Sequence, residues 1–263
     1  MALTVADIRQ RLAQASSEEF EVLERSLRAD TRKGVQAALV QTRRRLEAEA
    51  IERARVAELY SFEETLSRGR VAVGLDEVGR GPLAGPLTVG AVVLDPAAKP
   101  ITGLNDSKQV PEAKRPLLAE QIKRCARAWA VVDVDPSRID EKGMSACLRA
   151  AFSEALSRIE QQGVDVEVAL LDGNPLHFDD RELNVVHGDA RCASIAAASL
   201  IAKVSRDAYM VSCDEIYPGY DFASSKGYGS QRHREAIAAR GLTPIHRVSF
   251  CGNFLQESLF PEA

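Results

Sequence analysis

The stretch from Val71 to Leu94 constrains the fold of this chain more than any other part of it. Small apolar residues from Val71 to Leu75 lead directly into two carboxylates, Asp76 and Glu77, and a second apolar run extends from Leu87 to Leu94. Short, continuous apolar runs of this length are typical of buried strands. The pattern predicts a strand that brings two adjacent acids to the edge of a sheet, where they need cations, hydrogen bonds or solvent.

A glycine-rich segment separates the two runs and places Arg80 between Gly79 and Gly81. Glycine allows a backbone to approach a ligand more closely than other residues, and arginine offers a planar set of donors that suits phosphate and sugar oxygens. The segment therefore favours a loop that contacts a polyanion. A polar turn between two strands is the alternative for the same residues.

The rest of the chain from residue 71 alternates between strand and helix patterns. It predicts a mixed α/β sheet in which three strands end at or near an acid, and the carboxyl ends of strands are the usual place for a site in such sheets. We predict further strands over Arg127–Val134, Val168–Leu171 and Leu183–Val186, and helices from near Pro111, over Ser145–Gln162, Ala193–Cys213 and Ser230–Arg240.

Residues 1–70 have the pattern of helices only. Apolar residues recur at helical spacing, Ser16 or Ser17 is suited to cap a second helix, and an amphipathic third helix is expected to run to about Tyr60. We therefore predict a helical extension over residues 1–70 and a catalytic domain over residues 71–263, of which residues 213–263 form a helical C-terminal part. Packing or dimer contact and substrate binding remain equally open as roles of the extension.

Composition limits the class of protein. The 263 residues are 45% hydrophobic and 27% charged, which suits one globular domain with a modest addition. The five cysteines are widely spaced without a CxxC pair, so neither a disulfide framework nor a zinc site is indicated. No apolar targeting segment or membrane-spanning run is evident, and we expect a cytoplasmic protein without a membrane partner.

Four acids, Asp76, Glu77, Asp172 and Asp189, are expected at one end of the predicted sheet. Together they would repel one another unless hard cations bound between them, and a set of oxygen ligands suits Mg²⁺ or Mn²⁺. Such ions would also offset the net charge of −4, which is otherwise unusual for a protein that binds phosphates. Three of the acids have an alternative interpretation: a tight turn at Asp172, the start of a helix at Asp189, and a surface turn at Glu77.

Several motifs together resemble the bacterial type 2 ribonucleases H, the ribonuclease HII family. The resemblance covers about residues 71–255 and follows the order of the family's motifs. It is carried by Gly74–Pro86, Leu104–Lys108, Leu171–Asn174, Gly188–Asp189 and Ser194–Asp207.

The resemblance implies an RNase H-like fold, a mixed five-stranded sheet flanked by helices, in which the four acids are the catalytic and metal-binding set. It also implies that Gly79, Arg80 and Gly81 contact the ribose 2′-hydroxyl and that Tyr228 stacks on the sugar past the RNA-to-DNA junction. Lys108, Lys203 and Lys226 are candidate phosphate contacts, with a solvated lysine as the alternative for each. Ser225 precedes Lys226 where histidine is common in the family.

The implied protein is an endoribonuclease, expected as a monomer, that uses two Mg²⁺ or Mn²⁺ ions. It would cut RNA in RNA·DNA hybrids and the 5′ side of single ribonucleotides in duplex DNA, leaving a 3′-hydroxyl and a 5′-phosphate, and so remove ribonucleotides from DNA during replication and repair. One alternative is a ribonuclease HIII-like enzyme restricted to hybrids, against which Arg80 and the all-helical first 70 residues argue. The other is a hybrid-binding module without catalysis.

Overall fold

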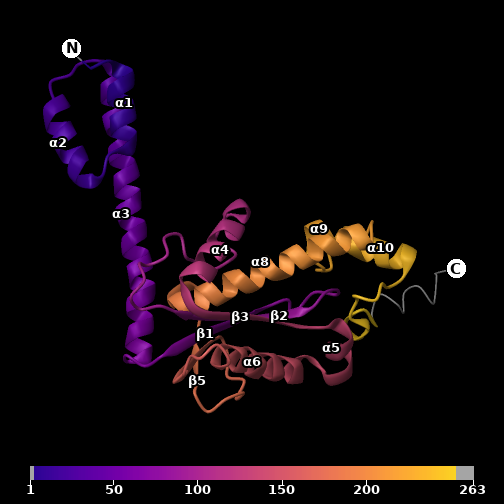
Figure 1. The fold of residues 1–263 in the computed structure, drawn as a ribbon. Coiled ribbons are helices and arrows are strands. Elements are labelled where there is room, and N and C mark those ends of the chain that lie inside the picture. The colour runs from indigo at the N-terminus through magenta and orange to yellow at the C-terminus, as the bar shows by residue number, and fades with distance from the viewer. Residues whose placement is uncertain (1–2, 253–263) are drawn as a thin grey trace. The chain divides into compact units, whose positions relative to one another are not determined.

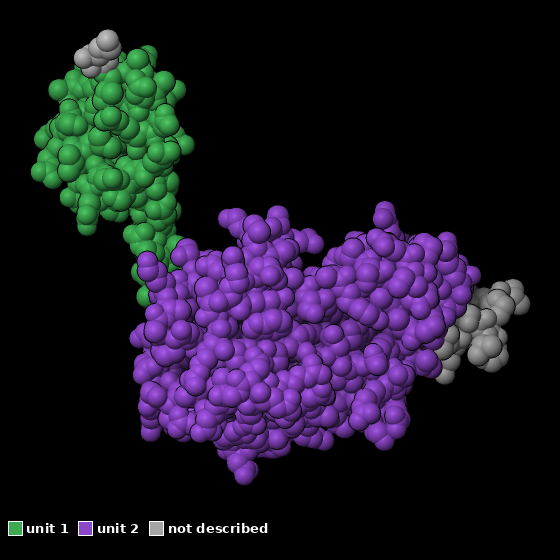
Figure 2. Space-filling model, in the orientation of Figure 1, with its two compact units in different colours: residues 1–57 green, residues 58–263 purple. Residues whose placement is uncertain are grey.

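The computed structural model describes residues 3–252. The chain divides into two compact units, residues 1–57 and residues 58–263, shown in different colours in Figure 2. The division lies inside the helix α3 (Lys33–Ser67), so that the last turns of this helix belong to the second unit.

The first unit contains α1 (Val5–Gln14), α2 (Ser17–Leu27) and the beginning of α3. Thr4 and Ser16 each begin a helix with a capping box, because each accepts a hydrogen bond from a first-turn N–H while an acid three residues later accepts one in return. The helices enclose a small apolar core formed by Ile8, Leu12, Ala15, Phe20, Val35, Ala38, Leu39 and Leu46.

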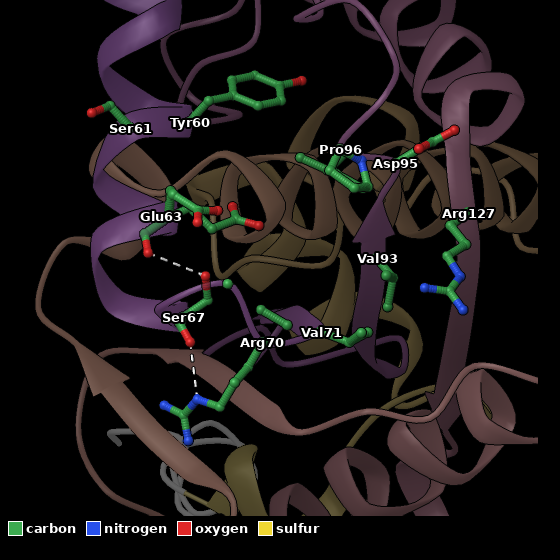
Figure 3. A pocket seen from close by; sticks show the side chains of 14 residues that line it. Tyr60, Ser61, Glu63, Ser67, Arg70, Val71, Val93, Asp95, Pro96 and Arg127 are labelled. Atoms are coloured by element: carbon green, nitrogen blue, oxygen red, sulfur yellow. Dashed lines mark hydrogen bonds between the residues drawn. The ribbon is translucent and has the colours of Figure 1, made fainter.

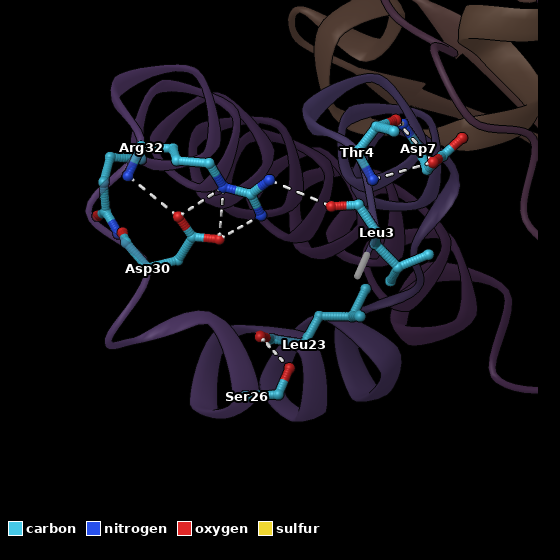
Figure 4. A network of polar contacts seen from close by, with 8 residues as sticks. Leu3, Thr4, Asp7, Leu23, Ser26, Asp30 and Arg32 are labelled. Carbon is cyan, nitrogen blue, oxygen red and sulfur yellow. Dashed lines mark hydrogen bonds and ion pairs between the residues drawn. The ribbon is translucent and has the colours of Figure 1, made fainter. Parts of the chain in front are cut away.

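Arg32 connects the loop before α3 to the beginning of the chain. Its guanidinium donates to Asp30 Oδ2 at 2.6 Å and to the carbonyl oxygen of Leu3 at 3.1 Å. Figure 4 shows these contacts beside the cap of Thr4 and Asp7. This polar network links the loop between α2 and α3 to the residue before the cap of α1.

Within the described residues, the second unit contains one five-stranded sheet in the order β3-β2-β1-β4-β5. The three strands β1, β2 and β3 pair antiparallel, whereas β1 pairs parallel to β4 and β4 parallel to β5. This is the mixed sheet that the sequence predicted. The strands are β1 (Ala72–Val78), β2 (Leu87–Leu94), β3 (Ala126–Val134), β4 (Val168–Asp172) and β5 (Glu182–Val185).

Helices cover both faces of the sheet. Figure 1 shows α4 (Arg115–Cys125) and α8 (Ala193–Ile216) on one side, and α5 (Pro136–Lys142) and α6 (Met144–Glu160) on the other. The alanine-rich α8 packs very closely on the strands: a Cβ on Gly90 would lie 2.3 Å from the carbonyl oxygen of Ala198. Glycine is therefore required at position 90.

The chain after α8 forms a smaller apolar cluster. It contains α9 (Phe222–Ser225), α10 (Gln231–Arg240) and the 3₁₀ turn η2 (Val248–Phe250); a similar turn, η1 (Glu112–Lys114), precedes α4. Inside the cluster, His233 and His246 are buried and joined through their Nε2 atoms at 3.0 Å.

The observed elements differ from the predicted ones in several places. Strand β1 continues through Asp76 and Glu77 to Val78, because these residues pair with Gly90, Val89 and Thr88 of β2. Helix α3 runs past Tyr60 to Ser67. The short helix α5 and a four-residue helix α7 (Gly188–Arg191) were not predicted. No helix among the described residues is long and apolar enough to cross a membrane, and all five cysteines are unpaired.

Candidate active site

The sheet brings the acids together at one end, where the neighbouring parallel strands β1 and β4 reach their carboxyl-terminal residues. The parallel register pairs Leu75 with Leu171, so Asp76 and Asp172 follow at equivalent positions of β1 and β4. The backbone N–H of Gly188 donates to Asp172 Oδ1 at 2.6 Å, which places the neighbouring Asp189 at the same end. Thus residues from three distant parts of the sequence converge here, as predicted from the strand ends.

A sharp turn positions Asp189. His187 has φ 56°, in the left-handed region, and reverses the chain between β5 and α7. Gly188 follows in a crowded position, where a Cβ would lie 2.6 Å from Ile195 Cδ1. Asp189 therefore lies within α7 and not in the first turn of the long helix α8.

The environment of the acids opposes their ionisation. Asp76 is only 7% exposed; burial raises its pKa well above the ordinary value, and repulsion from Glu77 and Asp172 adds to the shift. Burial also raises the pKa of Glu77, and attraction to the nearby Arg80 partly offsets this shift. Burial raises the pKa of Asp189 as well, and repulsion from Asp172 adds to that shift. Such shifts mark carboxylates that lack sufficient positive charge.

Two basic side chains lie beside the acids. Arg80 Nη1 is 3.1 Å from Glu77 Oε1, and Lys108 Nζ is 3.6 Å from Asp189 Oδ2 and 3.7 Å from Asp106 Oδ1. Desolvation would lower the pKa of Lys108, but attraction to Asp106 and Asp189 raises it overall. Asp106 is a fifth acid at this end, and the sequence analysis did not assign it to the site although it precedes Lys108 by two residues.

The chemistry of the donor set fits a divalent cation. No group of three or more His, Cys, Asp or Glu side chains in residues 3–252 is already arranged so as to hold a metal ion. The acids nevertheless offer only hard oxygen donors, and burial and mutual repulsion raise the pKa values of Asp76 and Asp189, which a bound cation would relieve. Asp76, Glu77, Asp172 and Asp189 are the residues that would hold it.

The two glycines of the neighbouring loop, Gly79 and Gly81, differ in the space that surrounds them. Gly79 has φ 89°, and a Cβ there would lie 2.3 Å from Arg206 Nε and 2.7 Å from the carbonyl oxygen of Pro86. A Cβ added at Gly81 would have none of the atoms considered within 4 Å, and the φ of Gly81 is not in the left-handed region. The fold therefore requires glycine at position 79 but not at position 81, where a side chain would project into open space.

Two buried arginines hold this loop. Arg247 donates to the carbonyl oxygens of Gly79 at 2.7 Å, Arg80 at 3.0 Å and Gly85 at 2.8 Å. Burial lowers the pKa of Arg247 to about 10, so it remains a cation at neutral pH. Arg206 donates to the carbonyl oxygens of Pro86 at 2.9 Å, Ala84 at 3.1 Å and Lys226 at 2.9 Å.

Neither arginine was predicted to have a role at the site. Both are 0% exposed, which is rare for arginine and explains why each guanidinium makes several hydrogen bonds to carbonyls. For Arg206 a signal exists in the sequence, because Ala202 and Met210 lie one helical turn before and after it and place it on the apolar face of α8.

The segment that carries Tyr228 packs against the same loop. The carbonyl oxygen of Gly227 accepts hydrogen bonds from the N–H groups of Leu83 at 2.9 Å and Ala84 at 3.3 Å. Tyr228 itself is 46% exposed. Ser225 closes the turn, since its Oγ accepts from Gly227 N–H at 3.2 Å.

The three candidate lysines have different surroundings. Lys108 lies within the acidic cluster, whereas Lys203 forms an ion pair with Asp207 at 2.8 Å, one turn along α8. Lys226 is in the left-handed region, with φ 52°, and its Nζ donates to the carbonyl oxygen of Ala223. Contact with phosphate stays a prediction for all three.

The structure thus combines a mixed sheet, helices on both of its faces, and acids gathered beside a glycine loop. The fold matches that of solved ribonucleases H, and this defines its class as RNase H-like. The family model described as ribonuclease HII matches residues 73–253, and the model described as the ribonuclease HII N-terminal domain matches residues 4–67. The chain belongs to the ribonuclease HII family, and its class of enzyme is a ribonuclease H endonuclease.

Individual relatives agree with this assignment. A ribonuclease HII of Listeria monocytogenes (serotype 4b) is 41% identical over 252 residues, which cover 95% of each chain. The crystal structure of ribonuclease H2 from Pyrococcus horikoshii matches with a TM-score of 0.62 and 25% identity, over 72% of this chain and 98% of that one. A structure of Bst-RNase HIII in complex with Mn²⁺ shares the fold, with a TM-score of 0.61 at 22% identity, over 78% of this chain and 71% of that one.

Proposed function

We propose that this enzyme cuts on the 5′ side of a ribonucleotide, both in RNA·DNA hybrids and at single ribonucleotides embedded in duplex DNA. The products would carry a 3′-hydroxyl and a 5′-phosphate, and the biological role would be removal of ribonucleotides from DNA during replication and repair. Asp76, Glu77, Asp172 and Asp189 are the proposed catalytic and metal-binding residues.

The convergence of four acids at one sheet edge carries the proposal. Burial and mutual repulsion raise the pKa values of Asp76 and Asp189, and a fold has no structural reason to maintain such a cluster. Bound Mg²⁺ or Mn²⁺, two ions during catalysis, would supply an activated water and stabilise the leaving oxygen. The proposal also includes that cleavage requires Mg²⁺ or Mn²⁺, because all of the donor atoms of the four acids are oxygens.

The chain's own residues orient the substrate. Gly79, Arg80 and Gly81 form a loop whose carbonyl oxygens at 79 and 80 are occupied by Arg247, so the loop is held in one conformation before substrate arrives. The open space at Gly81 would admit the ribose and its 2′-hydroxyl, the group that distinguishes RNA from DNA.

Tyr228 is the proposed contact for the sugar past the RNA-to-DNA junction. Its backbone is tied to the loop through Gly227, and its side chain is partly exposed. An aromatic ring packed against that sugar would leave no room for a further hydroxyl. Lys108, Lys203 and Lys226 are proposed to contact phosphates, which position a duplex but do not read its sequence.

Cleavage of three labelled duplexes tests the proposal: DNA alone, DNA with one ribonucleotide, and an RNA·DNA hybrid, each with Mg²⁺, Mn²⁺ or chelator. We expect metal-dependent cutting on the 5′ side of the single ribonucleotide and within the hybrid, with DNA left intact. Cutting of the hybrid only would identify a ribonuclease HIII-like specificity. Binding of the hybrid without cleavage would identify a hybrid-binding module.

A further inference from the structure

The last turns of α3 reach the beginning of α8. The backbone N–H of Ser194 donates to Glu63 Oε2 at 2.6 Å, and Cys192 Sγ donates to the same oxygen at 3.3 Å. Cys192, the N-cap residue of α8, makes no capping bond with its own side chain. Glu63 therefore supplies, from a distant part of the chain, the acceptor that the first turn of α8 lacks.

Glu63 is half-buried. It is among the residues that line a cavity of about 410 Å³ between α3 and the strand ends at Ala72, Val93 and Arg127 (Figure 3). Burial raises the pKa of Glu63, although its hydrogen bonds to Ser194 and Cys192 oppose the shift. A carboxylate held in such a place has a fixed position, unlike a solvated one on a helix surface.

The first turn of α8 touches both segments that carry proposed catalytic acids. A Cβ on Gly74, two residues before Asp76 in β1, would lie 2.1 Å from the carbonyl carbon of Ser194. On the other side, Ile195 Cδ1 packs against Gly188, which precedes Asp189 and donates to Asp172. These contacts leave no free space, so displacement of this turn would displace the acids.

A second contact from α3 reaches the same junction. The guanidinium of Arg191, the last residue of α7, lies 4.3 Å from the ring centroid of Phe62. Phe62 and Glu63 are adjacent on α3, and their partners Arg191 and Ser194 lie on either side of the connection between α7 and α8. Asp189 is two residues before Arg191 in the same short helix.

We infer that Glu63 is a positioning residue for the acidic cluster: it fixes the junction of α7 and α8 and thereby holds Asp189 against Asp172 and Asp76. The inference rests on the proposed catalytic role of those acids. Glu63 and Phe62 lie in the part of α3 that belongs to the second unit.

Substitutions at position 63 test the inference, with kcat and KM measured on the single-ribonucleotide duplex and binding of Mn²⁺ alone measured by calorimetry. Glu63→Ala should lower kcat about tenfold with KM nearly unchanged, and weaken Mn²⁺ binding by a similar factor. Glu63→Gln should recover most of both, because its amide oxygen can accept the same hydrogen bond. Glu64→Ala, at the exposed neighbour, is the matched control and should behave as wild type.

Glu63→Asp keeps the test decisive if the alanine variant does not fold. The aspartate retains the charge but withdraws the carboxylate by one methylene, so kcat and Mn²⁺ affinity should fall while the unfolding temperature stays near that of wild type. If Glu63→Ala or Glu63→Asp has the kcat and the Mn²⁺ affinity of the wild type, the inference is wrong. It is also wrong if the loss of activity is fully explained by a smaller fraction of folded protein. Asp189→Asn separates the two proposals, since an active variant would contradict the role of Asp189 itself.

Discussion

At the scale of single residues, the acids proposed to carry the reaction also destabilise the metal-free protein when they are ionised. Asp76 is almost fully buried, and its charge is opposed by burial and by its neighbours Glu77 and Asp172. Raised pKa values mean that the folded, metal-free protein holds these protons more tightly than the unfolded chain. Stability from this source is therefore present at low pH and is lost as the pH rises through the folded-state pKa.

Asp76→Asn should separate stability from activity. We expect activity to fall at least about 100-fold, while the free energy of unfolding of the metal-free protein at neutral pH rises, because the buried charge whose pKa is raised is removed. Mn²⁺ should raise the unfolding temperature of the wild type but hardly that of the variant. A loss of activity below about tenfold would contradict a direct metal-ligand role for Asp76.

Gly79→Ala and Gly81→Ala form a matched pair within one loop. Gly79→Ala should destabilise the protein by about 2 kcal/mol or more, because the methyl group meets Arg206 and Pro86 at a positive φ. Gly81→Ala should change stability by less than about 0.5 kcal/mol but lower kcat/KM on the single-ribonucleotide duplex by about 100-fold. Unimpaired cleavage by Gly81→Ala would remove this position from the substrate contact.

At the scale of elements, hydrogen bonds between buried polar groups fix the loops around the site. Thr243 N–H donates to His246 Nδ1 at 2.9 Å, and His233 Nδ1 lies 2.8 Å from the carbonyl oxygen of Tyr228. Only neutral rings satisfy this chain, with His246 Nε2–H donating to His233 Nε2 and His233 Nδ1–H donating to Tyr228. The position of the Tyr228 backbone thus depends on two uncharged histidines.

Acid should weaken this element. Burial, with added repulsion from His233, lowers the pKa of His246 to about 4, below its unfolded value of 6.5. The stabilisation is therefore complete above pH 6.5 and is lost as the pH falls towards 4. Urea unfolding at a series of pH values should show His246→Phe less stable than wild type at pH 7.5 by about 1–3 kcal/mol, with a difference that narrows below pH 6. A constant difference would contradict the assigned cause.

At the scale of the whole molecule, the change from the first unit to the second falls within one helix. Residues 58–67 of α3 contribute to the second unit: Leu59 is buried in its core, and the Tyr60 hydroxyl accepts a hydrogen bond from Ile101 N–H at 3.1 Å. A domain boundary at residue 70 therefore remains a proposal, and the compact units divide thirteen residues earlier, after Ala57.

Two truncations distinguish these boundaries. Removal of residues 2–57 should leave the unfolding temperature of the second unit nearly unchanged, whereas removal of residues 2–67 should cost at least about 3 kcal/mol, since Leu59 and its neighbours leave a cavity. Equal stability of the two variants would contradict the assignment of residues 58–67 to the second unit. If the variant that lacks residues 2–57 has a higher KM on one duplex, the first unit binds substrate. If its KM is unchanged, packing or dimer contact is left as the role of the first unit.

The sequence by itself determined most of the sheet and the convergence of the predicted acids at one end of it. Continuous apolar runs, helical spacing and glycines act locally, so they can be seen in a linear pattern; even the end of α3 at Ser67 has a local signal in Arg68 and Gly69, both at positive φ. The convergence of Asp76 and Asp172 followed from the rule that parallel strands end at one edge.

Tertiary structure alone decided which residues support the site. Glu63 meets Ser194 across 131 positions of sequence, and Arg247 meets Arg80 across 167. Neither pair has a local pattern, because a buried charge is satisfied by whichever backbone groups the fold brings within hydrogen-bonding distance. Tertiary structure likewise brings Asp106 and Asp189 to the same lysine, Lys108, and gives Gly79 and Gly81 different surroundings in one loop.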